Sequence, residues 1–244
     1  MKKLVLFSSL LVLLSANAAH AEWSAKAEAG VVAARGNTDA DSANLKTDIL
    51  FKFAQWQHQL GATGVYSSDD TGTTGQRWEV RQQSDYDFSA QGFAYESLRY
   101  ESDRFSGFAY QATGGTGVGW RFFDDPITKL SVQAGIGYKQ YETRDALADD
   151  GVTVIPGERK DEMIGQGKGY FERVLTETTK VIDKALVESG ADNTFAQNDL
   201  SFQVQIFGSL ALAVGVSVRY NTNPPPGFRN TDTLTTLNLV YEHK

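Results

Sequence analysis

DLSFQVQIFGSLALAVGVSVRY, residues 199–220, decides the fold class of this chain. Apolar and polar residues alternate through it twice, on either side of Gly208 and Ser209, which is the pattern of two β-strands joined by a tight turn. A helix would need apolar residues three and four apart instead, so the stretch predicts a β-hairpin. One face of each strand is apolar throughout: Leu200, Phe202, Val204 and Ile206, then Leu210, Leu212, Val214, Val216 and Val218.

The same period of two recurs along the rest of the chain. It predicts an all-β fold of about twelve antiparallel strands. The pattern is poorest in 179–190, which also fits a short helix, and it changes face midway through 91–102. The strands are expected near residues 23–35, 42–54, 56–68, 76–88, 91–102, 108–122, 128–142, 160–174, 179–190, 195–206, 210–221 and 231–243.

The connections between these strands alternate in length. Every second connection is a tight turn, around Gln55, Ser89, Asp124, Thr176 and Gly208. The others are mostly longer and polar, and the last of them holds the run Pro224–Pro226, which cannot donate to a sheet ladder. Short turns at one end and long loops at the other are typical of transmembrane up-and-down β-barrels of the outer membrane, whose short turns face the periplasm.

Alternation alone does not say which face of a barrel is inside. A soluble, lipocalin-like barrel has the same period with its apolar face inward. Two features favour an apolar face toward lipid. The polar face of the segment 76–88 is nearly all charged, and aromatic residues collect where an interfacial girdle would lie, at the short-turn end: Trp23, Trp56, Trp120 and Phe207.

The N-terminus has the pattern of an export signal. Lys2 and Lys3 precede an apolar run, and Ala19-His20-Ala21 fits the cleavage pattern of signal peptidase. We therefore predict that residues 1–21 are a cleaved signal peptide and that residues 22–244 form one outer-membrane β-barrel domain. A retained membrane anchor is the alternative, but the apolar run is short for a membrane-spanning helix.

The composition of the predicted mature chain excludes some classes of function. Removing Lys2 and Lys3 leaves 21 Lys and Arg against 30 Asp and Glu, a net charge of −9, which disfavours a nucleic-acid partner. There is no cysteine, and the two remaining histidines, His58 and His243, are far apart in sequence, so no structural zinc site and no cofactor is expected. Acidic pairs in the predicted outer loops fit solvated turns better than a calcium site: Asp39/Asp41, Asp69/Asp70 and Asp149/Asp150.

No catalytic constellation stands out in the sequence. A hydrolase of membrane lipid needs a serine, a histidine and an orienting Asn or Asp close together, and the G-x-S-x-G motif is absent. Both mature-chain histidines map to the periplasmic end of the predicted barrel. We therefore expect no catalytic residues and no enzyme. The alternative of a membrane lipid enzyme would gain only if Ser, Asn or Asp side chains clustered around a histidine.

The inward face of the predicted barrel is the candidate functional site. Buried charges must pair with opposite charges or face water, so these side chains would line either a narrow pore or a closed, ion-paired plug. Twelve strands lie between the filled eight-stranded barrels and the sixteen-stranded porins, so both arrangements are physically reasonable. The candidate lumen-lining residues are Lys46, Asp48, Lys52, Arg77, Glu79, Arg81, Asp85, Asp87, Arg121, Lys139 and Arg219.

Three stretches resemble a known family: GNTDADSANLKTD (36–48), YESDRFSGF (100–108) and YNTNPPPGFRNTDTLTTLNLVY (220–241). They are similar to the YdiY-like salt-induced outer-membrane proteins, a family of unknown function, and the resemblance covers essentially the whole predicted mature chain. It implies an outer-membrane β-barrel and a link to envelope or salt stress, and it brings no catalytic residues. One departure is the C-terminus, where Glu242-His243-Lys244 follows Tyr241 instead of an aromatic end.

The sequence thus leaves two main functional hypotheses. One is a narrow passive pore for ions or small solutes. The other is a non-conducting structural or interaction barrel that binds lipopolysaccharide or a protein partner through its outer loops. The expected surroundings are the outer membrane, its lipid and lipopolysaccharide, and the assembly machinery that inserts such barrels.

Overall fold

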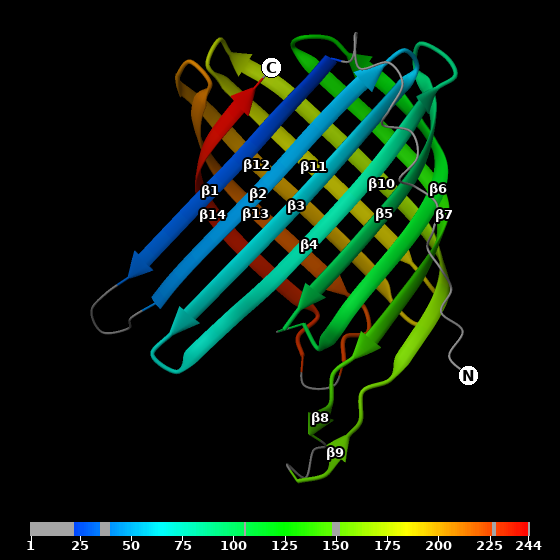
Figure 1. Ribbon diagram of the computed structural model, residues 1–244, viewed down its shortest axis with the longest axis vertical. Coiled ribbons are helices and arrows are strands. Elements are labelled where there is room, and N and C mark those ends of the chain that lie inside the picture. Colours follow the sequence, from blue (N-terminus) through cyan, green and yellow to red (C-terminus); the bar gives the residue numbers. More distant parts are fainter. Residues whose placement is uncertain (1–21, 35–39, 105, 148–151, 226–227, 244) are drawn as a thin grey trace.

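A computed structural model of the protein describes residues 22–34, 40–104, 106–147, 152–225 and 228–243. Twelve long strands close into an antiparallel barrel, in the order β1-β14-β13-β12-β11-β10-β7-β6-β5-β4-β3-β2 (Figure 1). The predicted all-β barrel of about twelve strands is therefore confirmed. The barrel strands are β1 (Glu22–Ala34), β2 (Ala40–Phe53), β3 (Trp56–Asp69), β4 (Gly72–Asp87), β5 (Gly92–Asp103), β6 (Phe108–Asp124), β7 (Thr128–Thr143), β10 (Arg159–Thr176), β11 (Thr179–Ser189), β12 (Thr194–Phe207), β13 (Leu210–Asn221) and β14 (Thr231–His243).

The alternating sequence gives the barrel an apolar outer wall. Along β13, Leu212 and Val214 are exposed, whereas Ala211 and Ala213 between them are buried. Successive side chains of a strand point to opposite faces, so one apolar set covers the outside of the barrel. This inverted arrangement is typical of membrane barrels and differs from a soluble barrel, whose apolar face is inside. No helix in the described part of the chain is long and apolar enough to span a membrane.

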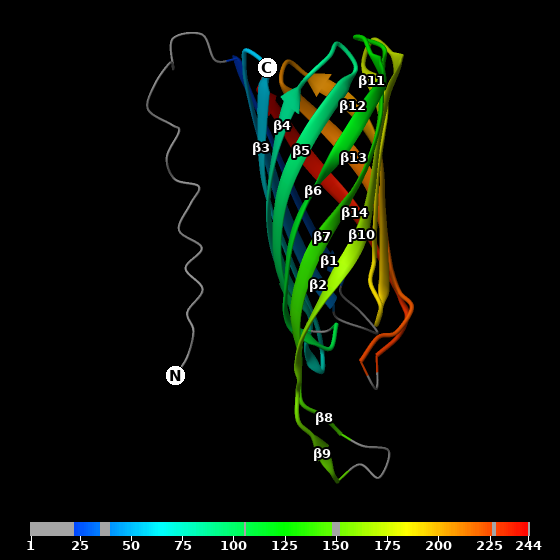
Figure 2. The same ribbon diagram turned by 90° about the vertical axis from the view of Figure 1, so that its right-hand side faces the viewer.

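The two ends of the barrel differ in the length of their connections. Short turns follow β2, β4, β6, β10 and β12 at the end drawn uppermost in Figure 1, which we call the short-turn end. The opposite end, the loop end, carries a small additional hairpin of β8 (Ala146–Leu147) and β9 (Val154–Ile155) that projects beyond the barrel (Figures 1 and 2). The predicted leader, residues 1–21, lies outside the described residues.

One predicted long loop is a tight turn. The sequence predicts a polar loop between residues 68 and 76, but β3 runs to Asp69 and β4 begins at Gly72. Asp69 accepts hydrogen bonds from the backbone N–H and the hydroxyl of Thr71, at 2.8 and 2.6 Å, and Gly72 has a φ of 125°. Only glycine adopts this backbone conformation readily, so local turn chemistry, rather than polarity, sets the length of the connection.

Two ambiguous segments are regular strands. Residues 179–189 form β11, which pairs with β10 and β12 along its whole length, so the helical alternative is wrong. β5 does not change face: its pairing with β4 is continuous from Arg77↔Asp103 to Asp87↔Phe93. The sequence pattern misled because Phe93 and Tyr95 of β5 are aromatic side chains on the inner face, where both are buried.

The barrel is flattened. It is clearly narrower in Figure 2 than in Figure 1. Glycines on the inner face make room for aromatic rings: a Cβ atom at Gly119 would lie 2.2 Å from the ring of Phe93, and one at Gly135 would lie 2.5 Å from the hydroxyl of Tyr95. The wall formed by β6 and β7 therefore lacks side chains where the rings of β5 fill the interior.

The strand pair that closes the barrel reaches the short-turn end. β1 and β14 close the barrel with Ala25 opposite His243, and the ring of Trp23 lies 4.3 Å from that of His243.

In the turn between β6 and β7, the Asp125 carboxylate accepts hydrogen bonds from the backbone N–H groups of Thr128 and Ile127, both at 2.8 Å. The amide of Thr128 and then that of Ile127 lower the pKa of Asp125 below its usual range.

Candidate functional site

The lumen holds charged side chains that meet from different walls of the barrel. β5 and β13 lie on opposite sides, six strands apart in either direction around the closed sheet. Arg219 of β13 nevertheless donates a hydrogen bond to Glu101 of β5, at 2.5 Å from Nη2 to Oε1. Flattening brings these walls close enough for side chains to bridge them directly.

This bridge belongs to a cluster toward the loop end. Arg99 donates from Nη1 to Glu101, at 2.9 Å, and from Nη2 to Glu188 of β11, at 2.6 Å. The ammonium group of Lys139 lies 3.6 Å from the same Glu188 oxygen. Glu101 is 1% exposed and Glu188 is 2% exposed, so this part of the lumen is sealed from solvent. We call Arg99, Glu101, Lys139, Glu188, Arg219 and Phe195 the loop-side cluster.

Phe195 holds the cations of the loop-side cluster together. Its ring centroid lies 5.0 Å from the guanidinium carbon of Arg219, 5.2 Å from that of Arg99 and 5.5 Å from the ammonium nitrogen of Lys139. Cations at such distances are attracted to an aromatic ring, most strongly where water is excluded. Phe195 itself is 1% exposed. The cluster therefore combines ion pairs with an apolar centre that leaves no room for bulk water.

A loop covers the mouth beyond the loop-side cluster. Pro225, in the connection between β13 and β14, is buried, and the N–H of Phe228 donates to its carbonyl at 3.1 Å. Both residues lie against Gly107, in the connection between β5 and β6: a Cβ atom there would be 2.7 Å from Phe228 and 2.8 Å from Pro225. The proline-containing loop thus reaches from one wall to the opposite one. Pro226 lies outside the described residues.

A second set of bridges lies deeper in the barrel. Lys168 of β10 donates to Gln83 of β4 and to Ser97 of β5, both at 2.9 Å, and its ammonium group lies 4.7 Å from the ring centroid of Tyr95. The Tyr95 hydroxyl donates to Gln166 of β10 at 3.3 Å. These contacts join walls that are three or four strands apart around the barrel.

The ion pairs outside the loop-side cluster are more open to solvent. Arg81 pairs with Asp48, and the ammonium group of Lys184, from β11, lies 3.8 Å from the same carboxylate. The side chains of Lys184 and Arg81 are 34% and 27% exposed. These side chains are less completely buried than Glu101 and Glu188 of the loop-side cluster, although Glu79 lies 3.7 Å from Arg99 and so joins the two groups.

The structure brings several of the candidate lumen residues together. Asp48, Arg81 and Glu79 form one group, and Arg121 pairs with Asp87 at 2.7 Å and lies 3.8 Å from Asp85. Lys139 and Arg219 belong to the loop-side cluster. The other three stand opposite carboxylates of neighbouring strands: Lys46 and Lys52 opposite Glu28 and Glu22 of β1, and Arg77 opposite Asp103 of β5.

Sequence reasoning missed most of the loop-side cluster. Arg99, Glu101 and Glu188 lie in the two segments whose alternation was hardest to assign, 91–102 and 179–190. In both segments apolar residues share the inner face with charged ones, as Ile182 does on β11, so polarity alone does not mark the lumen. A signal was available: Arg99, Glu101 and Asp103 alternate with Leu98 and Tyr100.

A further cluster, on the outer wall, also escaped the sequence. His58 of β3 lies opposite Ser84 of β4, with 2.8 Å between Nδ1 and Oγ, and the Gln82 side-chain amide donates to the same hydroxyl at 2.6 Å. A serine beside a histidine is the feature that would favour an enzyme. However, Ser84 is only 3% exposed, so its hydroxyl is covered by its own hydrogen-bond partners and is closed to a substrate.

The acidic pairs considered as calcium ligands do not assemble into a metal site in the described residues. No group of three or more His, Asp or Glu there is placed to hold a metal ion. Asp69 is used in the β3–β4 turn. Asp39, Asp149 and Asp150 lie outside the described residues.

Comparison with known proteins decides the family. The family model described as "Protein of unknown function, DUF481" matches residues 27–243, which is nearly the whole barrel. The chain belongs to this DUF481 family. The resemblance seen in the sequence is confirmed by a relative, the uncharacterized protein YdiY of Escherichia coli strain K12, which is 23% identical over 216 residues, covering 87% of this chain and 80% of that protein.

Solved structures similar to this DUF481 barrel include other membrane barrels. The NanC porin has a TM-score of 0.52 at 10% sequence identity, covering 91% of this chain and all of that one. The translocator domain of the autotransporter NalP from Neisseria meningitidis has a TM-score of 0.49 at 11% identity, covering 95% of this chain and 90% of that one. At these identities the NanC likeness shows the fold, an outer-membrane type of β-barrel, and not an activity.

Proposed function

We propose that this DUF481 protein is an outer-membrane barrel whose lumen is closed to solutes, and that it works as a structural or interaction protein rather than as an open pore or an enzyme. The observation that carries the proposal is the loop-side cluster. It links β13, β5 and β11 by charge-assisted hydrogen bonds of 2.5–2.9 Å around carboxylates that are 1–2% exposed. An aqueous channel would instead leave such charges in contact with water.

The membrane location follows from the outer wall. Large apolar side chains are exposed all around the barrel, and aromatic residues such as Trp23, Trp56 and Trp120 lie at the short-turn end. Such a surface is stable only in lipid, and in outer-membrane barrels the short-turn end faces the periplasm. Export by a cleaved signal peptide, contacts with lipopolysaccharide, help from the assembly machinery and a link to salt stress remain predictions.

A narrow pore is the second candidate, and the solvent-exposed charges outside the loop-side cluster favour it. The side chains of Arg81 and Lys184 are 27% and 34% exposed and share the Asp48 carboxylate. In this version the loop-side cluster is the barrier that an ion must cross.

Paired variants test the barrier. We would replace four members of the loop-side cluster, two cations and two anions, with serine: Arg99, Glu101, Glu188 and Arg219. The matched control replaces two cations and two anions outside the cluster, which are also linked by ion pairs: Lys26, Glu28, Lys180 and Glu242. Both chains are refolded into planar bilayers in potassium chloride, after heat-modifiable migration has shown that each barrel is folded.

The proposal predicts single-channel steps from the cluster variant and a silent control. If the cluster variant also stays silent while it is folded, the cluster is not the barrier. If both the control and the cluster variant give current steps, the barrier does not lie at the loop-side cluster.

A further inference from the structure

Arg77 of β4 points into the barrel and has no partner there in the part of the chain that the structure describes. It stands opposite Asp103 of β5, and the next residue, Trp78, is 47% exposed on the outer wall. Successive side chains of a strand alternate between the two faces, so the Arg77 side chain is inward. Its guanidinium group makes no hydrogen bond and no ion pair with any described residue. Arg77 is only partly buried, so solvent-sized space remains beside its unused N–H donors.

The carboxylates that act on Arg77 are held by other arginines. Arg219 donates to Glu101 at 2.5 Å and to Asp103 at 3.4 Å. Among the charged groups that act on Arg77, Arg219 has the largest effect, and that effect is repulsive. Arg77 thus lies beside a second guanidinium group that already occupies the neighbouring acids.

The network of ion pairs around this point is neutral without Arg77. Its contacts, none longer than 3.8 Å, connect five cations with five carboxylates. The cations are Arg81, Arg99, Lys139, Lys184 and Arg219, and the carboxylates are Asp48, Glu79, Glu101, Asp103 and Glu188. Arg77 therefore adds a positive charge that no member of this network balances.

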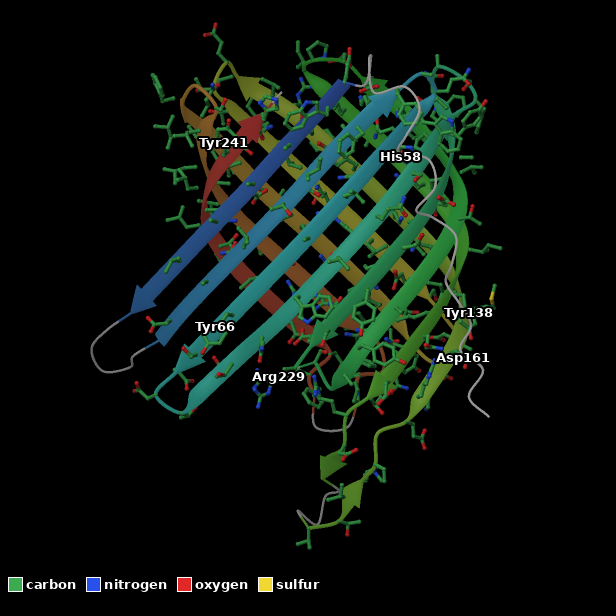
Figure 3. The ribbon with its side chains drawn as sticks, viewed as in Figure 1. His58, Tyr66, Tyr138, Asp161, Arg229 and Tyr241 are labelled. Carbon is green, nitrogen blue, oxygen red and sulfur yellow. The ribbon has the colours of Figure 1, made fainter. Side chains whose placement is uncertain are left out.

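Arg77 lies on the loop-end side of the loop-side cluster. In the pairing of β4 with β5 it is opposite the last residue of β5, two positions beyond the pair Glu79 and Glu101. On β3 it is opposite Val65, and the next residue, Tyr66, lies toward the loop end in Figure 3. The loop end of an outer-membrane barrel faces outward from the cell, so Arg77 is on the external side of the closure proposed above.

We propose that Arg77 binds an oxyanion group, a carboxylate or a phosphate, of a small solute that enters the barrel from the loop end. The planar guanidinium fork matches two oxygens of such a group. A partly buried charge without a partner is costly, so a bound anion is favoured there and a metal cation is repelled. Phosphates of membrane lipids lie outside the wall and do not reach an inward side chain. The site rests on the membrane orientation proposed above, and it does not depend on a closed lumen.

Protection from an arginine reagent tests the site. The predicted mature chain, refolded in bilayers, is treated with phenylglyoxal, which modifies accessible guanidinium groups, and the modified arginines are mapped by mass spectrometry. We expect Arg77 to react, and we expect inorganic phosphate or acetate to slow its modification about tenfold at about ten times the dissociation constant. The phosphate and acetate arms distinguish a phosphate ligand from a carboxylate ligand. Potassium chloride at the same ionic strength controls for screening.

Arg159 is the control residue in the same samples. It is exposed on β10 and donates to Gln140 at 2.6 Å, so its modification should be the same with each anion. The proposal would be overturned if Arg77 stayed unmodified in a folded barrel in which Arg159 reacts. Failure of both oxyanions to slow the reaction at Arg77, or equal slowing by chloride or at Arg159, would also overturn it.

The variant Arg77→Gln separates binding from a structural role. Because Arg77 has no partner to lose, we expect the urea midpoint of this variant in chloride to be no lower than that of the wild type. Phosphate raises the stability of proteins in general, so the informative result is a smaller rise in Arg77→Gln than in the wild type and in the control Arg159→Gln.

Two results of these titrations would contradict the site. A clear loss of stability of Arg77→Gln in chloride would mean that Arg77 has a structural partner, and an equal rise in phosphate would mean that binding lies elsewhere. Current steps from the folded wild-type barrel would contradict the closed lumen and would leave the protection of Arg77 as the test of this site.

Discussion

Replacing Arg219 with methionine should destabilise the folded barrel strongly. Met keeps much of the side-chain volume but removes the guanidinium group that lies 2.5 Å from Glu101 and 3.4 Å from Asp103. Glu101, which is 1% exposed, would keep its ion pair with Arg99 at 2.9 Å. Breaking a buried pair by removing one partner costs about 3–5 kcal/mol of unfolding free energy, and the remaining arginine places Arg219→Met near the lower end, at about 3 kcal/mol.

The double variant Arg219→Met with Glu101→Leu gives the internal control. Removing both charges leaves no unpaired carboxylate, so we expect it to lose less stability than Arg219→Met alone. A surface control is Lys160→Met, because Lys160 lies 3.7 Å from Glu158 and both side chains are well exposed. That pair should be worth less than about 1 kcal/mol.

Urea titrations of the refolded barrels, followed by tryptophan fluorescence, measure these differences. With a slope of about 1–3 kcal/mol per molar urea, the Arg219→Met midpoint should fall by at least about 1 M. A loss below about 1 kcal/mol, equal to that of Lys160→Met, would refute the reasoning, because it would mean that water already solvates the lumen at Glu101.

Three further predictions follow from other parts of the barrel. Gly119→Ala should lower the unfolding free energy by about 1–3 kcal/mol because its Cβ would overlap the ring of Phe93. Gly64→Ala, with open space around it, should be close to neutral. The same urea titrations compare the two variants. Asp125 has a lowered pKa in the folded state, so its stabilising effect is present above pH 4 and is lost as the pH falls through that lowered value. The stability curves of the wild type and Asp125→Ala should therefore converge in acid, and a constant gap would contradict this cause. The buried Ser84 hydroxyl should not act as a nucleophile, so bilayers containing the folded protein should form no lysophospholipid; a product that disappears in Ser84→Ala would show an enzyme.

The sequence was sufficient for the fold because the physics of a membrane barrel is repeated in every strand. Alternation, with Leu212 and Val214 outward between small inner residues, specifies the strands. The charged polar face of residues 76–88 and the aromatic residues at the short-turn end then indicate that the apolar face meets lipid. Local chemistry was harder to anticipate. The Asp69–Thr71 hydrogen bonds make the β3–β4 connection a tight turn although its residues look like a loop.

The arrangement of the lumen could be predicted only in part. The sequence shows that Asp48, Arg81 and Arg219 share the polar face of their strands, but it does not show which strands lie opposite each other across a flattened barrel. Contacts such as Arg219 with Glu101 join residues more than a hundred positions apart. The contact between His58 and Ser84 depends on the pairing register of β3 and β4. Sequence motifs do not specify that register.

Single-channel recording of the wild-type protein tests the closed lumen most directly. The predicted mature chain would be refolded into a planar bilayer in potassium chloride, and heat-modifiable migration of the same sample would show that the barrel is folded. If the loop-side cluster closes the lumen, we expect no single-channel current steps. Discrete, reproducible current steps from the folded wild-type barrel would contradict it and would establish an aqueous path past Glu101 and Glu188.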